Sequence, residues 1–444
     1  MSPQSPRAFQ GPSVDRRIML KGLLGAAGVA ALPTLAACSS SSSKSSSSST
    51  GGAASGTVSL GSNASDAVPK KAFQAVYDAF QAKNPSIKVQ VNTKDHDTFQ
   101  EQINSYLQAT PDDVFTWFAG YRMQFFAAKG LSNKINDVWD TIGNNFPQSV
   151  HDLSKGQDGN YYFVPIYYYP WAVFYRKSVF AAHNYTVPTD WNGFISLCEK
   201  MKADGLNPIA FADADKWPAM GTFDQLNMRI NGYQFHMDLM HGKAAWTDAK
   251  VKAVFDHWTQ ILPYHQPGYI GRKWQDAAQS LLQKKSGMYL LGTFVAQQFT
   301  NPDDLADLDF FAFPAIDPQW GQDSIEAPVD GFMLSKNPKN RAAAAKLLEF
   351  IGSADGEGAY LKVDNSYDAL VTGYDTSGYN AIQKKSAQLF ASAQHVSQFM
   401  DRDANPAFTS TVMQPQLQAY LQNPGSIGSI LSGIEQQKQS IYNS

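Results

Sequence analysis

The stretch Tyr161–Tyr175, YYFVPIYYYPWAVFY, is the densest aromatic run of the 444-residue chain. Both parts on either side of Pro170 have strand-like composition, and Pro165 places the first part at the edge or end of a sheet. Three consecutive tyrosines lie between the two parts. Core packing explains any single ring, but three neighbouring hydroxyls are difficult to bury because each needs a hydrogen-bond partner. We therefore expect a short extended crossing between two sheets, whose polar-rimmed aromatic surface suits a sugar ring.

Length and composition set the limits for the rest of the chain. Hydrophobic residues make up 43% of the sequence, and the length predicts about two domains. The formal net charge is −3, with no basic stripe, so nothing indicates a nucleic-acid partner. Cys38 and Cys198 are the only two cysteines, which excludes a disulfide framework.

Residues 1–37 have the pattern of a signal peptide. Arg16 and Arg17 precede the uncharged run Gly22–Ala37, which is short and rich in Gly and Ala. The arginine pair resembles a twin-arginine signal, and the ending Leu35–Cys38 resembles a bacterial lipobox. In such signals the thiol is acylated, so we expect lipidation of Cys38 and anchoring at the extracellular face of the cell membrane. The alternative is an ordinary cleavage site beside an incidental cysteine. Residues 38–56 are rich in Ser and Gly and predict a flexible tether.

The first part of the folded chain alternates strands and helices. Strand patterns at Val58–Leu60, Ile87–Val91 and Val114–Trp117 are separated by two amphipathic helices. This order predicts a parallel sheet with right-handed crossovers. Ligands of such sheets bind beyond the carboxyl ends of the strands. These ends lead into three loops, Ser62–Asp66, Asp95–Asp97 and Phe118–Arg122.

Motifs of catalysis and of cofactor binding are absent from the sequence. It contains no G-x-S-x-G, no H-E-x-x-H and no phosphate-binding loop ending in Gly-Lys-Ser/Thr. His236 and His241 are five positions apart, off one helical face, and no Cys accompanies them, so we expect neither a metal nor a cofactor. Cys198 falls on an apolar helix face and is interpreted as a buried structural thiol. The sequence does not decide whether two carboxylates form a catalytic pair, because only the three-dimensional structure shows how far apart they lie.

Four stretches in order resemble the extracellular solute-binding proteins of bacterial ABC importers, in the maltose-binding group (family 1). They are PDDVFTW at Pro111–Trp117, the hinge-like Val164–Lys177, SGMYLLGTF at Ser286–Phe294, and Asp330–Phe332 with Ser335–Asn337. The resemblance covers about the whole mature chain. It implies a protein without enzymatic activity that captures a mono- or oligosaccharide and delivers it to ABC permease subunits, as a monomer.

The resemblance also implies the fold. It is α/β, the two-lobe periplasmic-binding-protein fold of type II-like arrangement, in which discontinuous lobes are joined by a multi-segment hinge and the ligand lies in the cleft between them. Lobe one takes residues 57–166 plus 311–364, and lobe two takes 171–308 plus 368–444. The hinge crossings fall at residues 167–170, 309–310 and 365–367.

Site residues are carried over by position. Trp117 and Trp217 become platforms for stacking on a sugar, Asp215 accepts hydrogen bonds from sugar hydroxyls, and Tyr169 stands where the maltose-binding member has an acidic residue. The complete set of expected ligand contacts is Asn63, Asp95, Trp117, Tyr168, Tyr169, Trp171, Asp215, Trp217, Phe294, Asp330 and Gly331. Two alternatives stay open at this stage, an envelope-tethered glycoside hydrolase and a binder of a peptide or a phosphorylated polyol.

Overall fold

The computed structural model describes residues 54–442. The expected signal peptide at residues 1–37, the lipidation site Cys38 and nearly all of the tether lie outside the described residues. The first strand already begins at Gly56, which the sequence assigned to the tether. Within residues 54–442 no helix is both long and apolar enough to cross a membrane.

The first lobe is built on a five-stranded sheet of order β2-β1-β3-β10-β4. Its strands are β1 (Gly56–Ser62), β2 (Ile87–Thr93), β3 (Val114–Phe118), β4 (Phe163–Tyr168) and β10 (Val329–Leu334). Strand β1 pairs in parallel with both β2 and β3, which confirms the parallel order predicted for the start of the chain. Strand β10 is antiparallel to both β3 and β4.

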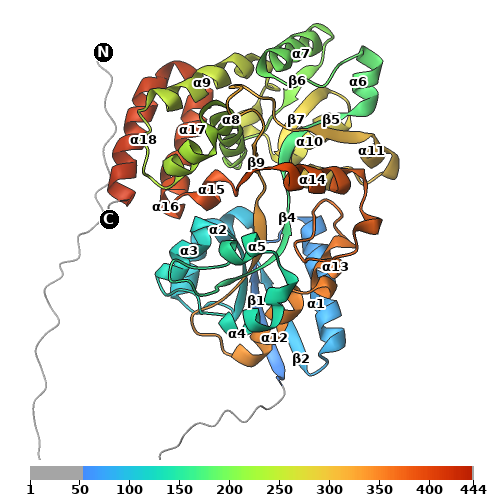
Figure 1. The fold of residues 1–444 in the computed structure, drawn as a ribbon, viewed down its shortest axis with the longest axis vertical. Helices are drawn as coiled ribbons and strands as arrows, with labels where there is room; N and C mark the ends of the chain where they lie inside the picture. Colours follow the sequence, from blue (N-terminus) through green and yellow to red (C-terminus); the bar gives the residue numbers. More distant parts are fainter. Residues whose placement is uncertain (1–53, 443–444) are drawn as a thin grey trace, which may run out of the picture. The chain divides into compact units, whose positions relative to one another are not determined.

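Seven helices accompany this sheet in the described chain (Figure 1). They are α1 (Ala67–Lys83), α2 (His96–Gln108), α3 (Tyr121–Ala128), α4 (Asn136–Ile142), α5 (Gln148–Leu153), α12 (Arg341–Ile351) and α13 (Ala354–Leu361). Helix α1 shows the typical pattern, since Phe73, Val76, Tyr77 and Phe80 recur at helical spacing and are all buried. This apolar stripe fixes the helix against the sheet and leaves the loops at the strand ends to form the site.

The second lobe is built on a four-stranded sheet of order β6-β7-β5-β8. Its strands are β5 (Trp171–Arg176), β6 (Asn207–Ala210), β7 (Ser286–Gly292) and β8 (Leu308–Phe311). The helices of this lobe are α6 (Lys177–His183), α7 (Trp191–Ala203), α8 (Pro218–Met240), α9 (Ala249–Ile261), α10 (Trp274–Leu282), α11 (Pro302–Asp307), α14 (Ala381–Ser392), α16 (Pro406–Phe408), α17 (Gln414–Gln422) and α18 (Ile427–Tyr442). Cys198 is buried on α7, as its place on an apolar face predicted.

The chain first passes between the sheets through Tyr169 and Pro170, inside the predicted crossing 167–170 (Figure 1). The second predicted crossing, 309–310, is wrong, because these residues lie inside β8 and pair with β5. The chain stays with the second lobe through β9 (Ser324–Glu326), since buried Arg229 of α8 donates to the carbonyls of Phe313 and Ser324. Residues 327–328 make the second crossing, so the expected start of lobe one at 311 is also wrong.

The third crossing extends further along the chain than residues 365–367. Asp368 pairs with Tyr168, and the backbone N–H groups of Leu370 and Val371 donate to Glu357 of α13. Residues 368–371 therefore still belong with the first lobe, although the sequence assigned them to the second. The chain reaches the second lobe at α14, where Lys385 forms an ion pair with Asp309 of β8.

A further connection was not predicted from the sequence. Strand β11 (His395–Ser397) pairs with β9, and the short helix α15 (Met400–Asp403) follows it. The Met400 N–H donates to Asp224 of α8 over 2.7 Å, and Asp401 forms an ion pair with Arg122 of α3 over 2.8 Å. Helix α15 thus binds both lobes instead of lying within the second.

Candidate functional site

A cavity of about 170 Å³ lies between the two lobes. Lobe one contributes the residues that follow β1, β2 and β3, namely the stretches around Asn63, Asp97 and Phe118. Lobe two contributes Trp217 after β6 and Phe294 after β7. Because β1 runs parallel to β2 and β3, and β6 runs parallel to β7, the loops at their carboxyl ends meet at one edge of each sheet. The loops expected at the site therefore contribute residues to this cavity.

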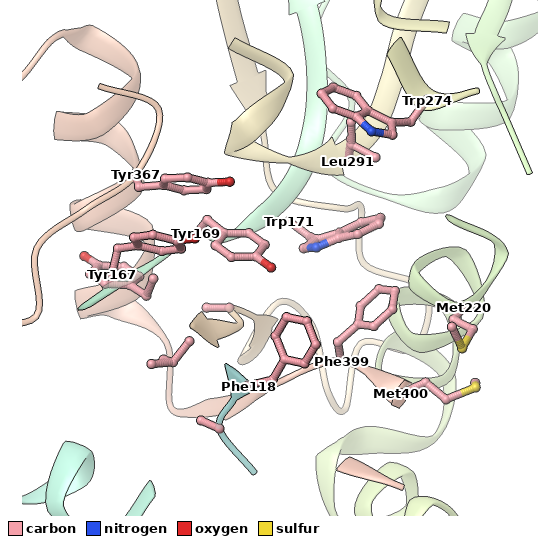
Figure 2. Packing of buried hydrophobic residues seen from close by; sticks show 14 of the residues in the cluster. Phe118, Tyr167, Tyr169, Trp171, Met220, Trp274, Leu291, Tyr367, Phe399 and Met400 are labelled. Carbon is pink, nitrogen blue, oxygen red and sulfur yellow. The ribbon is translucent and has the colours of Figure 1, made fainter. Parts of the chain in front are cut away.

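Aromatic rings form the wall of the cavity on the side of the second lobe. Trp171 meets Trp217 edge to face with centroids 6.1 Å apart, and Phe399 lies 5.1 Å from Trp171. Phe294 meets Trp274 at 5.1 Å, also edge to face. Figure 2 shows the rings of Tyr169, Trp171, Phe399 and Phe118 arranged around an open space. Such rings present apolar faces to a ligand.

The backbone just before Trp217 adopts an unusual conformation. Lys216, the residue before it, has φ of 66°, in the left-handed region that non-glycine residues rarely adopt. The loop is fixed at its start by Asp213, whose Oδ1 accepts the Ala219 N–H over 2.9 Å. Trp217 itself is half-buried and lines the cavity together with Asp215.

Arg402 holds one polar corner of the cavity. Its Nη1 donates to Asp330 Oδ1 over 2.6 Å, and its Nη2 donates to Tyr169 Oη over 2.7 Å. The guanidinium carbon also lies 4.2 Å from the ring centroid of Phe118. Burial lowers the pKa of Arg402, but the negative charge of Asp330 outweighs it, so the net pKa is raised and the guanidinium stays charged.

A second polar part of the cavity is rich in carboxylates. Asp97 comes from the first turn of α2 and Asp215 from the loop after β6, so the two lie on different lobes. Burial raises the pKa of Asp97 to about 6, with His96 and Lys273 opposing the shift and Asp215 and Asp95 adding to it. Burial likewise raises the pKa of Asp215, while Lys273 and His96 oppose the shift.

Asn63 and Asp95 line the cavity as expected, and each also has a structural contact. The Oδ1 atom of Asn63 accepts from Thr116 Oγ1 over 2.9 Å, and no described residue accepts a hydrogen bond from its Nδ2. Asp95 caps α2 by accepting the Thr98 N–H over 3.1 Å, a contact that lowers the pKa of its carboxyl. Asn63 therefore offers a donor to a ligand and Asp95 an acceptor.

Trp117 does not line the cavity, in contrast to the expectation from the sequence. Only 1% of its surface is exposed, and its ring packs against Phe126 at 5.5 Å and Phe99 at 6.3 Å. Its side chain points into the core of the first lobe because neighbouring strand residues face opposite sides of a sheet. The next residue, Phe118, takes the position facing the cavity.

Tyr168 and Gly331 also lie outside the cavity. Tyr168 is buried, and its ring centroid lies 4.2 Å from that of Phe390, so it packs against α14 instead of facing the cavity. Gly331 lies in β10 beside a register shift, where any β-carbon would overlap the carbonyl of Val164 in β4. Glycine is required there for the close approach of two strands. The other eight expected contacts do line the cavity: Asn63, Asp95, Tyr169, Trp171, Asp215, Trp217, Phe294 and Asp330.

Several cavity residues were not predicted from the sequence. Asp97 stands two positions after Asp95 in a loop that was already expected at the site, so its position was a sufficient signal. Lys273 and Trp274 open α10, and Arg402 belongs to α15. No local pattern marks these three residues, since they reach the cavity only through tertiary packing.

The described residues offer no metal site. No group of three His, Cys, Asp or Glu side chains in residues 54–442 is arranged to hold a metal ion. His236 and His265 are buried, and burial lowers the pKa of each to about 3, so both are neutral. The chemistry of the cavity is therefore that of aromatic faces combined with carboxylate, amide, ammonium and guanidinium groups.

Known proteins resemble this chain both in sequence and in fold. The family described as bacterial extracellular solute-binding protein matches residues 64–358. The bacterial solute receptor AcbH, described with an exclusive substrate preference for β-D-galactopyranose, is 48% identical, covers 87% of this chain and 99% of its own, and superposes with a TM-score of 0.85. A probable sugar-binding periplasmic protein of Rhizobium meliloti is 24% identical over 345 residues, which is 72% of this chain and 79% of the relative. The GacH receptor of Streptomyces glaucescens shares the fold, with 14% identity, a TM-score of 0.73, and coverage of 88% of this chain and 99% of its own.

Proposed function

Because the chain belongs to the bacterial extracellular solute-binding protein family, we propose that it is the sugar-capturing component of an ABC importer and that it takes up a single hexopyranose. The observation that carries the proposal is the cavity itself, in which three tryptophans meet a carboxylate corner and an arginine corner. Sugar rings have apolar faces that pack on indoles and hydroxyls that bond to polar groups.

The size of the cavity supports a monosaccharide. A cavity of about 150 Å³ is sufficient to hold benzene, so about 170 Å³ provides space for one six-membered ring. The two lobes are bonded to each other across the cavity, since Gln297 of lobe two donates to Asp364 over 2.9 Å and Gln275 donates to Asp66 over 3.4 Å. Hinge motion at Tyr169–Pro170 and at residues 327–328 would separate the lobes to admit the ligand.

The identity of the sugar is proposed from the relative AcbH. At 48% identity over 99% of that chain, its preference for β-D-galactopyranose makes galactose the first ligand to test here. We expect galactose to bind to this protein, and maltose and longer oligosaccharides to bind far more weakly because the closed cavity has no space for a second ring.

Titration calorimetry with galactose, glucose, maltose and maltotriose tests the proposal, with thermal unfolding as a second readout. A ligand present at 100 times its Kd stabilises the folded protein by about 2.7 kcal/mol. Binding of a trisaccharide with greater affinity than any monosaccharide would overturn the monosaccharide assignment. Absence of binding by every sugar would overturn the function itself.

Membrane attachment is part of the same proposal. Delivery to a permease requires the receptor to stay near the membrane, and Leu35–Cys38 supplies a lipobox-like sequence for a lipid anchor. A diacylated cysteine reaches the two-chain level needed for stable anchoring. The Cys38→Ala variant is expected in the medium and not in the membrane fraction, and its retention on membranes would contradict the anchor.

Catalysis and self-association are not part of the proposed function. The family consists of receptors that bind solutes, and we propose that this protein acts as a monomer without a chemical step. Asp97 and Asp215 are the carboxylates that a glycosidase would need, so an assay for reducing ends released from an oligosaccharide panel tests this point. Light scattering with and without galactose tests the monomer.

A further inference from the structure

The carboxylate corner of the cavity carries an excess of negative charge. Four cavity carboxylates, those of Asp66, Asp95, Asp97 and Asp215, face one ammonium group, that of Lys273. No ion pair within 4 Å links any of these five side chains to another described residue. The other two carboxylates of the cavity, Asp330 and Asp401, are neutralised by arginines.

Asp97 and Asp215 are distinguished within this corner by having no hydrogen-bond partner. Asp95 is occupied in capping α2, and Asp66 accepts from Gln275. Asp97 and Asp215 are half-buried, line the cavity from opposite lobes and accept no hydrogen bond from any described residue. Two carboxylates that line the cavity from both lobes and bind no protein donor are free to accept hydrogen bonds from a ligand between them.

We propose that Asp97 and Asp215 make the site select its ligand by charge, so that neutral and protonated amino hexopyranoses bind while hexuronates and sugar phosphates are rejected. The inference rests on the proposed sugar-binding function and adds the specificity determinant. Hydroxyl and ammonium groups donate hydrogen bonds to both carboxylates, whereas a carboxylate or a fully ionised phosphate group of the ligand has no donor to offer. Like charges that face each other across a binding site weaken binding.

The positive groups of the cavity do not compensate for this repulsion. Arg402 is already engaged by Asp330 and Tyr169. Lys273 and His96 act to lower the pKa of Asp97 and of Asp215, but burial and neighbouring carboxylates leave the pKa of each raised. The carboxylate corner therefore presents more negative than positive charge to a bound ligand.

Calorimetry with galactose, galactosamine and galacturonate tests the proposal on the wild type and on the variants Asp97→Asn, Asp215→Asn and Asp140→Asn. The three sugars share the ring and differ in charge. Asp140 is an exposed residue of α4 outside the cavity, so its variant changes the net charge equally without touching the site. Thermal unfolding verifies that each variant is folded.

We expect the wild type to bind galactosamine within about tenfold of galactose and galacturonate at least about a hundredfold more weakly. Each cavity variant should weaken galactose binding and reduce the ratio of galactose to galacturonate affinity by about tenfold, while Asp140→Asn leaves the ratio unchanged. Equal affinity of the wild type for galactose and galacturonate overturns the inference alone, as does a ratio that neither cavity variant alters. If the wild type binds none of the three sugars, the proposed function falls together with the inference.

Discussion

Arg402 of α15 donates a hydrogen bond to Asp330 of β10 over 2.6 Å, joining two residues that are 72 positions apart at the edge of the cavity. The same guanidinium also donates to Tyr169 in the first crossing. One side chain thus connects the first sheet, the crossing and the additional connection between the lobes. Since Arg402 is buried and bonded on two sides, it supports the site as well as lining it.

Replacing Arg402 by Met should lower the free energy of unfolding by about 3–5 kcal/mol, because the half-buried Asp330 carboxylate is left without its partner. The double variant Arg402→Met/Asp330→Asn removes both charges and should recover part of this loss. Chemical denaturation of the single and double variants gives the coupling energy between the two sites. Additive losses would show that the ion pair is not what stabilises this corner.

Trp117 and Trp217 should respond in opposite ways to replacement by Ala. Trp117 is buried in the core of the first lobe, so its removal should cost about 3–5 kcal/mol of folding stability. Trp217 is half-buried at the cavity, so its removal should leave the unliganded protein nearly unchanged and weaken sugar binding by about 1–3 kcal/mol, by analogy with stacking on other rings. Thermal unfolding and calorimetry of both variants test the pair. Early melting of Trp217→Ala together with full affinity would assign this side chain to the core.

Gly221→Ala should reduce sugar affinity, although alanine normally stabilises a helix more than glycine does. An added β-carbon at this position of α8 would overlap the ring of Trp171, which must then move within the cavity wall. The same replacement at Gly433 in α18 meets no atom within 4 Å and should stabilise the protein by up to about 1 kcal/mol. Calorimetry should show binding weakened about tenfold by Gly221→Ala and unchanged by Gly433→Ala. Equal effects of the two replacements would contradict a role of Gly221 in positioning Trp171.

The parallel start of the chain was predictable because hydrophobic period and strand order fix it locally. Burial of Phe73, Val76 and Phe80 on one face of α1 is what the 3.6-residue period requires. The loops after β1 and β2 were predictable for the same reason, since strand direction determines where the strands end. The second crossing was not predictable, because the aromatic run Leu308–Phe313 suits either sheet, and its pairing with β5 is decided by tertiary contacts.

Side-chain direction within β3 shows the limit of motif reasoning. The motif at Pro111–Trp117 ends in a tryptophan, yet the register of β3 turns that ring into the core and Phe118 toward the cavity. A shift of one residue exchanges the two faces of a strand. Arg402 illustrates the other limit, because no sequence period relates α15 to the strand that it contacts.

Asp97→Asn should stabilise the unliganded protein at pH 7 while weakening its binding of sugar. Burial raises the pKa of Asp97 from its ordinary value near 3.8 to about 6, so the charged form is less favourable in the folded than in the unfolded chain. A carboxyl with a raised folded pKa contributes stability below pH 4 that is lost as the pH rises through about 6. Each pKa unit corresponds to about 1.4 kcal/mol, and solvent screening of this half-exposed side chain reduces the gain of the variant to roughly 1–2 kcal/mol.

Sugar affinity should depend on pH in the opposite direction from this stability. Hydroxyl donors favour the charged form of Asp97, so binding by the wild type is strongest above pH 6 and weakens as the pH falls below it. Asp97 is also faced by His96, Lys273, Asp95 and Asp215. The Asp97→Asn variant therefore removes only that part of the pH dependence of sugar affinity that comes from Asp97 itself. Calorimetry between pH 5 and pH 8 should therefore show a smaller loss of galactose affinity at low pH for Asp97→Asn than for the wild type. Parallel pH profiles for the two proteins would show that Asp97 does not titrate in contact with the ligand.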